Sequence, residues 1–403
     1  MERFESRSAG FDAASRCRGR HRSVRHDAWG AACRVWGAAL ALAGVATAAG
    51  AEGLRILAPV EGQVIQRRTS TMGAVRVVVE GEVPAGTLVE ARVVDPRDVA
   101  WHPLERDGDR YVGTIPARAG DWRTLLVRRA GAEEADALVK RVGVGEVFVV
   151  AGQSNSANHG ESRLVPRGDR VAALAPDGTW RIAADPQPGA SGDAGSFLPP
   201  LGDRLVERFD VPVGFVACGI GATSVREWLP AGARFPNPPT LESRVKARAD
   251  GAWESDGAAF AMLVERMRQC GPEGFRAVLW HQGESDANQA DRSRTLAGPL
   301  YEDFLARLIT ASRREIGREV PWFVARASYH VPGDESSTEI RAAQNAVCRD
   351  GLALVGPDTD LLGAPFRDGG GKGVHFSGPG LVRHAESWFE KIAPWLEGRL
   401  GPR

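Results

Sequence analysis

The chain of 403 residues carries 51 Lys and Arg against 51 Asp and Glu, so its formal net charge at pH 7 is zero. A balanced chain of this kind has no global field that attracts nucleic acid or an anionic membrane, and no nucleic-acid partner is expected. Hydrophobic residues make up 43% and charged residues 25%, which is typical of a globular protein, and the length suits two domains.

Residues 1–51 have the pattern of a signal peptide. Five arginines between Arg16 and Arg25 form a basic start, and Arg34 is the last charge before an uncharged run at 35–51. That run ends in small residues, as a cleavage site requires. An uncleaved membrane anchor is the alternative, but the run is short for a bilayer span and rich in Ala and Gly. We predict cleavage, a secreted or periplasmic protein, and no stable membrane insertion afterwards.

Three cysteines, Cys218, Cys270 and Cys348, lie outside this leader. An odd number permits at most one bridge, so the protein is not a disulfide scaffold. No pair has the spacing of metal ligands, and no metal or cofactor is expected.

Residues 52–144 are predicted to form a small β-sandwich accessory domain. Short runs rich in β-branched and apolar residues alternate with turn residues. The runs are Ala74–Val79, Leu88–Val94, Tyr111–Ile115 and Thr124–Arg128. Because no nucleophile, base and acid occur together here, we expect structural support, with carbohydrate contact as the alternative.

Residues 145–403 have a different sequence pattern, in which near-continuous apolar runs alternate with segments of helical periodicity. The apolar runs are Glu146–Ala151, Val211–Val216, Ala277–Trp280 and Pro321–Ala325. Strands buried on both faces and alternating with helices predict a flavodoxin-like, three-layer α/β/α domain with a parallel sheet. In such a sheet the chemistry gathers at the carboxyl ends of the strands.

Polar motifs follow these predicted strands. Ser154 stands in Gly-Gln-Ser-Asn at 152–155, directly after the first strand. A glycine-rich turn at 218–224 and a polar block at 280–286 follow two others, and Gly-Val-His-Phe at 373–376 precedes the last predicted helix, which the apolar periodicity places near 380–396. Alone, Ser154 could simply cap a helix. With a histidine late in the chain and acids between, the order is one that a catalytic triad can take.

Taken together, Gly-Gln-Ser-Asn after Val-Gly-Glu-Val, the glycine turn, Trp-His-Gln-Gly-Glu-Ser-Asp and Gly-Val-His-Phe resemble the sialate O-acetylesterase and acetylxylan-esterase group of SGNH hydrolases. The resemblance covers Gly143 to Leu396. It implies a serine esterase that removes acetyl groups from a carbohydrate substrate. Asn155 and Arg226 resemble pocket positions of that group, and Gln153 and His159 beside the nucleophile are further substrate-binding candidates.

Ester cleavage assigns the remaining roles. A serine hydroxyl needs a base, and His375 can take the proton of Ser154 and pass it to the leaving sugar hydroxyl. The tetrahedral intermediate needs preset donors for its negative oxygen. We expect these donors to be the backbone N–H groups of Ser154 and Gly221 and the side-chain amide of Gln282.

The acid partner of His375 stays open between Glu284 and Asp368. Many relatives carry Asp three residues before the histidine, where this chain has Lys372. Asp368 can reach the histidine only if the glycine run at 369–371 turns back, whereas the block that holds Glu284 is intact. We therefore favour Glu284 over Asp368; Asp358 and Asp360 are weaker candidates.

Several alternatives accompany this hypothesis. His330 and His384 are rival bases, and His281 is expected to be structural. A glycoside hydrolase using Glu284 and a second carboxylate would leave Ser154 without a role. A non-catalytic carbohydrate-binding protein with a degenerate esterase domain is the other rival.

The pocket walls are expected in the loops 189–200 and 230–241. An anionic sugar would require an arginine there, with three arginines available, Arg163, Arg226 and Arg234. The sequence does not fix the oligomeric state.

Overall fold

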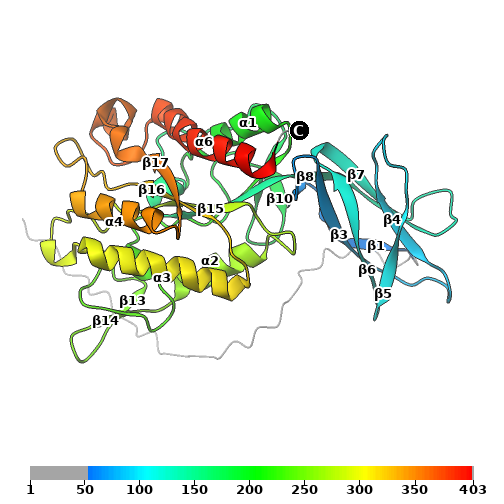
Figure 1. The fold of residues 1–403 in the computed structure, drawn as a ribbon, viewed down its shortest axis with the longest axis horizontal. Helices are drawn as coiled ribbons and strands as arrows, with labels where there is room; N and C mark the ends of the chain where they lie inside the picture. Colours follow the sequence, from blue (N-terminus) through cyan, green and yellow to red (C-terminus); the bar gives the residue numbers. More distant parts are fainter. Residues whose placement is uncertain (1–52, 402–403) are drawn as a thin grey trace, which may run out of the picture. The chain divides into compact units, whose positions relative to one another are not determined.

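The computed structural model describes residues 53–401, so the predicted signal peptide at 1–51 lies outside the described residues. Within 53–401 no helix combines the length and apolarity that a bilayer span needs. The described chain opens with an antiparallel β region (Figure 1). Its strands are β1 Arg55–Ala58, β2 Gln63–Gln66, β3 Met72–Glu80, β4 Val89–Val93, β5 His102–Asp107, β6 Arg110–Arg118 and β7 Gly120–Arg129. They follow the order β1-β3-β6-β5-β4-β7-β8, with β2 parallel to β8, and enclose a core of their own.

Strand β8, Ala137–Gly152, belongs to both β regions. Its first part pairs antiparallel with β7, and its second part pairs parallel with two strands of the following sheet. Buried Glu146 lies between these parts, where Arg67 Nε and Arg276 Nε each donate to one of its carboxylate oxygens at 2.6 Å. The predicted division at residue 144 therefore falls inside a continuous strand.

The parallel sheet has the order β9-β11-β8-β15-β16-β17, with β10 antiparallel at the β9 edge. Its remaining strands are β9 Val171–Leu174, β10 Trp180–Ile182, β11 Val213–Ala217, β15 Ala277–His281, β16 Trp322–Arg326 and β17 Leu354–Asp358. A separate three-stranded sheet consists of β12 Arg234–Phe235, β13 Val245–Ala247 and β14 Trp253–Ser255. All the apolar runs expected as buried strands lie in or overlap strands of the parallel sheet.

Helices cover both faces of the parallel sheet (Figure 1). One face carries α1 Leu198–Phe209 and α6 Gly378–Leu400; the other carries α2 Ala258–Arg268, α3 Gly298–Ile316 and α4 Thr338–Arg349. Side chains of a strand point alternately to opposite faces, so Val149 packs with Leu305 of α3 while Val150 packs with Trp388 of α6. The predicted α/β fold, with a parallel core after an antiparallel β region, is confirmed.

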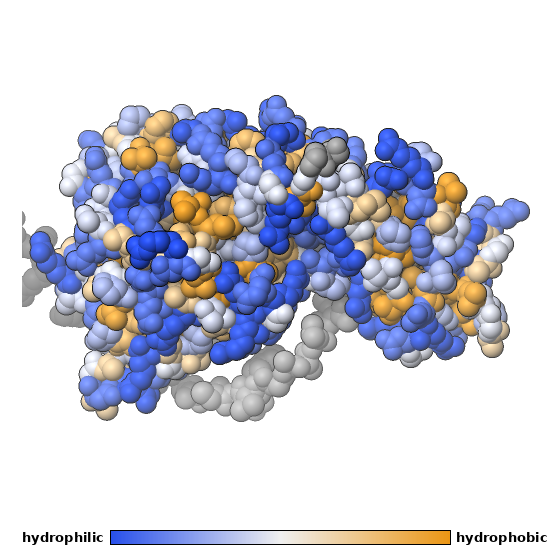
Figure 2. All heavy atoms as spheres, in the orientation of Figure 1, coloured by the Kyte–Doolittle hydropathy of each residue, from blue (hydrophilic) through white to orange (hydrophobic). Residues whose placement is uncertain are grey.

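On the face that Figure 2 shows, hydrophobic residues are scattered among hydrophilic ones. The three cysteines at 218, 270 and 348 are all free thiols. Within 53–401 no group of three His, Cys, Asp or Glu side chains could hold a metal ion.

Candidate active site

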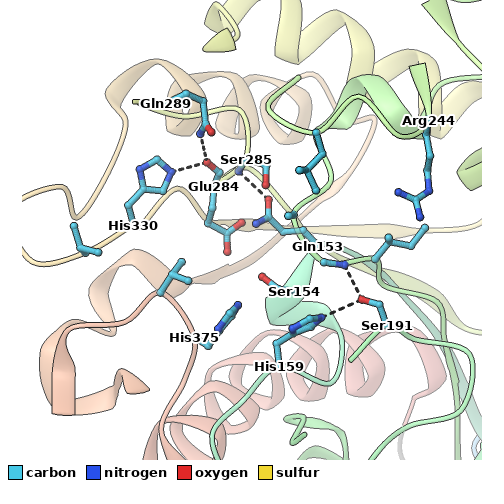
Figure 3. Close-up of a pocket in the computed structure, with 16 residues that line it drawn as sticks. Gln153, Ser154, His159, Ser191, Arg244, Glu284, Ser285, Gln289, His330 and His375 are labelled. Atoms are coloured by element: carbon cyan, nitrogen blue, oxygen red, sulfur yellow. Dashed lines mark hydrogen bonds between the residues drawn. The ribbon is translucent and has the colours of Figure 1, made fainter. Parts of the chain in front are cut away.

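A cavity of about 770 Å³ lies where the strands of the parallel sheet end (Figure 3). It is lined by residues that follow β8, β11, β15 and β16, together with residues that precede α6. The polar lining residues are Gln153, Ser154, His159, Ser191, Arg244, Glu284, Ser285, Gln289, His330 and His375. The fold thus brings the predicted nucleophile and the predicted base, which are distant in sequence, to the wall of one cavity.

Ser154 opens a single 3-10 turn, Ser154–Ser156, directly after β8. The turn depends on Gly152, whose φ of +128° disfavours other residues and whose hypothetical Cβ would lie 2.0 Å from the carbonyl oxygen of His281. The side chain of Ser154 lies at the cavity (Figure 3). Its backbone N–H has no acceptor among the described residues. This N–H can therefore serve an oxyanion, as the sequence predicts.

His375 is paired with Asp368. The Nδ1 atom of His375 lies 3.5 Å from Asp368 Oδ2, and the backbone N–H of His375 donates to Asp368 Oδ1 at 3.2 Å. In return the N–H of Asp368 donates to the carbonyl of His375 at 2.9 Å. Lys372, where relatives carry an acid, is exposed. The glycine run therefore turns back and places the earlier carboxylate beside the imidazole.

Glu284 makes different contacts from those expected of the acid partner. Its Oε1 accepts from Asn155 Nδ2 at 2.9 Å and lies 3.2 Å from His281 Nε2. Burial alone would raise the pKa of Glu284, but His281 and the hydrogen bond from Asn155 lower it to about 2. The carboxylate borders the cavity, yet its described partners do not include His375. The preference for Glu284 over Asp368 therefore has no support in these contacts.

Gln282 does not face the cavity, contrary to its predicted role as an oxyanion donor. It is fully buried, and its Nε2 donates to Asp286 Oδ2 at 2.7 Å and to the carbonyl of Thr223 at 3.1 Å. The physical reason is that the buried carboxylate of Asp286 needs hydrogen-bond donors, and the amide of Gln282 supplies one. The amide of Gln282 is therefore bonded to buried partners and does not line the cavity.

Arg226 and Asn155 are likewise not among the residues that line the cavity, contrary to their predicted contact with substrate. Arg226 has no exposed surface, and its guanidinium lies 3.3 Å from Asp286 and donates to the carbonyls of Asn237 and Arg294. The side-chain amide nitrogen of Asn155 donates to Glu284 and to the carbonyl of Val374, in the loop before His375. Both side chains are held by the buried acids, and they position loops rather than a ligand.

Gly221 and His159 line the cavity as expected, and they are linked through Ser191, which lies in the loop 189–200 expected as a pocket wall but was not itself singled out. The N–H of Gly221 donates to Ser191 Oγ at 2.7 Å, and that oxygen lies 3.1 Å from His159 Nε2. The His159 ring stacks on His375 with ring centres 5.4 Å apart. Burial and the charge of His375 lower the pKa of His159, so a neutral His159 can accept from the Ser191 hydroxyl. The Gly221 amide, predicted for the oxyanion, is therefore already bonded.

The rival bases have other partners. His330 lines the cavity, but its ring nitrogens lie 2.7 Å from Asp334 Oδ2 and 2.6 Å from the carbonyl of Glu284. His384 is fully buried in α6, where its Nε2 accepts from Trp388 Nε1 at 3.0 Å. Both ring nitrogens of His330 are therefore engaged, and His384 is buried away from the cavity that holds Ser154.

Comparison with known proteins identifies the family. Residues 144–362, more than half of the chain, match the family described as carbohydrate esterase, sialic acid-specific acetylesterase. The chain belongs to this family. As a carbohydrate esterase it has the acetylesterase activity of that family, and its substrate is an acetylated carbohydrate. The matched segment includes Ser154, Gly221 and Glu284, and it ends before Asp368 and His375.

One solved structure agrees on the fold of this esterase. A carbohydrate acetylesterase from Xanthomonas citri aligns with a TM-score of 0.51 at 17% identity, covering 83% of this chain and 74% of that one. A family 2 carbohydrate esterase with a carbohydrate-binding domain, from Corynascus thermopiles (Myceliophthora fergusii), aligns with a TM-score of 0.36 at 14% identity, covering 87% and 100%. Among curated proteins, no sequence matches this esterase.

Proposed function

We propose that this esterase cleaves O-acetyl esters of carbohydrates through an acetyl-serine intermediate, with Ser154 as nucleophile and His375 as base. The observation that carries the proposal is that the side chains of Ser154 and His375 line one cavity (Figure 3) and that Asp368 Oδ2 lies 3.5 Å from Nδ1 of the imidazole. A base whose second nitrogen faces a carboxylate is oriented and stabilised as it takes a proton.

The reaction then runs in two steps, acetylation of Ser154 and hydrolysis of the acetyl-serine. Ser154 Oγ attacks the acetyl carbonyl while His375 takes its proton, and collapse of the intermediate sends that proton to the departing sugar oxygen. Water next attacks the acetyl-serine ester, His375 takes the proton of water and returns a proton to Ser154 Oγ, and acetate leaves. Negative charge on the carbonyl oxygen is met by the N–H of Ser154.

Arg244 supports an acidic sugar, such as sialic acid, as the preferred substrate. It lines the cavity with 30% of its side chain exposed, whereas the three arginines considered from sequence do not line it. Within the described chain its ion-pair partner is Glu227, 3.6 Å away, and burial raises the pKa of that acid to about 7. The guanidinium can offer its positive charge to a carboxylate of the substrate.

Acetate release from O-acetylated sialic acid and from acetylated xylan tests this proposal. We expect Ser154→Ala and His375→Ala to abolish turnover of both substrates, and His330→Ala to retain it. Arg244→Met should raise KM for the acidic sugar alone, with Arg234→Met as the control, because Arg234 pairs with Asp250 away from the cavity. Full activity of His375→Ala with loss in His330→Ala would refute the choice of base. Equal KM changes on both substrates would refute the role of Arg244.

The same experiments address the remaining alternatives. An organophosphonate should label Ser154, and a glycoside hydrolase would give no adduct there. Absence of Ser154-dependent acetate release would favour a binding protein. Secretion stays a prediction from residues 1–51.

A further inference from the structure

Gln153, the residue before Ser154, has a side-chain amide with a fixed orientation. It is 3% exposed, and its Oε1 accepts from the N–H of Ser285 at 3.0 Å, from the N–H of Gly283 at 3.4 Å and from Gln282 Nε2 at 3.3 Å. An amide turned the other way would set its own N–H groups against these three donors. The nitrogen of Gln153 must therefore occupy the opposite side.

That nitrogen is an available donor at the cavity. Gln153 lines the cavity next to Ser154, and Nε2 has no acceptor among the described residues. Nε2 of Gln153 is not one of the buried side-chain atoms that lack both solvent contact and a hydrogen-bond partner. Oε1 of Gln282, by contrast, is such an atom. Figure 3 shows the amide with its oxygen toward Ser285 and its nitrogen on the other side. A ligand oxygen can therefore reach the donor.

The other expected donors are occupied. Gln282 Nε2 serves Asp286, and the N–H of Gly221 serves Ser191. Of the three donors predicted from sequence, only the N–H of Ser154 has no partner in the described chain. A tetrahedral intermediate gains most from several preset donors around one oxygen. The site as built needs a second donor close to Ser154.

We propose that the side-chain amide of Gln153 donates to the acetyl carbonyl oxygen and holds the negative oxygen of the tetrahedral intermediate, together with the N–H of Ser154. Gln153 is then a catalytic residue, and Gln282 is a positioning residue that fixes its amide. This role rests on the serine mechanism proposed above. It differs from substrate binding because the donor is used most when charge develops on the oxygen.

Gln153→Glu tests the role with little change of shape. The substituted side chain keeps an oxygen for the three N–H donors and replaces the donating nitrogen by a second oxygen. We expect kcat on 4-nitrophenyl acetate to fall by about 10²–10³ with KM little changed, the loss typical of one missing oxyanion donor. Gln153→Met, which adds no charge, should lose a similar factor. Gln269→Glu, the same exchange far from the cavity, should retain the wild-type rate.

A boronic acid that forms a tetrahedral adduct with Ser154 separates catalysis from structure. Its inhibition constant should rise by the factor by which kcat/KM falls, while the affinity for the deacetylated sugar stays unchanged. Equal losses in sugar affinity and in kcat/KM would show that Gln153 only shapes the cavity and would overturn the inference. If Ser154→Ala is inactive while both Gln153 variants keep the wild-type rate, this inference fails alone. If Ser154→Ala keeps its activity, the proposed function fails first.

Discussion

Replacing Asp368 by Asn tests which acid supports His375. The substitution keeps the size of the side chain and removes a negative charge 3.5 Å from His375 Nδ1. The amide can still accept the backbone N–H of His375, which now bonds Asp368 Oδ1 at 3.2 Å. The loop should therefore keep its shape, and the change should act mainly on the charge that balances a protonated imidazole.

The expected loss follows from distance and exposure. Two unit charges 3.5 Å apart interact by about 5 kcal/mol at an effective dielectric near 20 and by about 1 kcal/mol in bulk water. The two side chains are 27% and 25% exposed, so the value lies between these limits. We take about 2–3 kcal/mol, which corresponds to roughly a hundredfold in kcat. A fully buried triad acid costs about 10⁴ when replaced in this way.

Steady-state hydrolysis of 4-nitrophenyl acetate provides the assay, with Glu284→Gln as the comparison. We expect Asp368→Asn to lose roughly a hundredfold in kcat/KM, and the loss to shrink at high salt because the pair is partly exposed. Glu284→Gln disturbs His281 and Asn155 rather than His375, so its loss should be smaller. Near-normal kcat/KM in Asp368→Asn, combined with inactivity of Glu284→Gln, would return the acid role to Glu284.

Three further substitutions have defined outcomes. Glu227→Gln should make the melting temperature depend less on pH between about pH 4.5 and 7. Burial raises the pKa of Glu227 from 4.5 to about 7, so the folded state favours the protonated acid. In the wild type, stability of up to about 3 kcal/mol is therefore present below pH 4.5 and is lost as the pH rises to 7. Arg226→Met should lower the free energy of unfolding by about 3–5 kcal/mol in urea titrations, because buried Asp286 loses its partner. Gly373→Ala should lower kcat/KM toward the level of Asp368→Asn, because its Cβ would lie 1.7 Å from Asp368 Oδ1.

Each substitution has an internal control. Parallel curves of melting temperature against pH for wild type and Glu227→Gln would show that this acid does not set the pH dependence. Arg234→Met removes an exposed pair and should cost less than about 1 kcal/mol; a similar cost for Arg226→Met would contradict the burial argument. Gly363→Ala adds a Cβ with nothing within 4 Å and should leave kcat/KM unchanged.

The sequence predicted the fold well because its strands are continuous apolar runs. Strand β8 is buried on both faces over residues 142–152, so every residue there is apolar or glycine except Glu146, which two arginines contact. The location of Ser154 followed directly, since parallel strands end at one edge. Periodicity also placed α6, and with it His375 just before the helix.

The direction of polar side chains could not be predicted in the same way. The family resemblance places an acid three residues before the histidine, where this chain has Lys372, but Gly369 and Gly370, with φ of +57° and +68°, turn the chain so that Asp368 reaches the imidazole. A linear pattern counts residues and does not register such a turn. Ser191 lies in the loop 189–200, which was expected as a pocket wall, but an irregular loop has no periodicity that could single out one of its residues.

The motif residues divide into two groups around two different centres. Gln153, Ser154 and His375 face the cavity, whereas Gln282 and Arg226 surround the fully buried carboxylate of Asp286. That carboxylate also accepts from Ser224 Oγ and from the N–H of Val225, and so joins the glycine turn after β11 to the loop after β15.

This division has a measurable consequence. A substitution around Asp286 removes a partner from a buried charge, so it should lower the melting temperature and kcat together. A substitution at the cavity leaves folding contacts in place and should lower kcat with little change in melting temperature. Plotting kcat against melting temperature for Gln282→Met, Arg226→Met, Asp368→Asn and His375→Ala should therefore give two separate groups, and a single line through all four would show that these residues act only through stability.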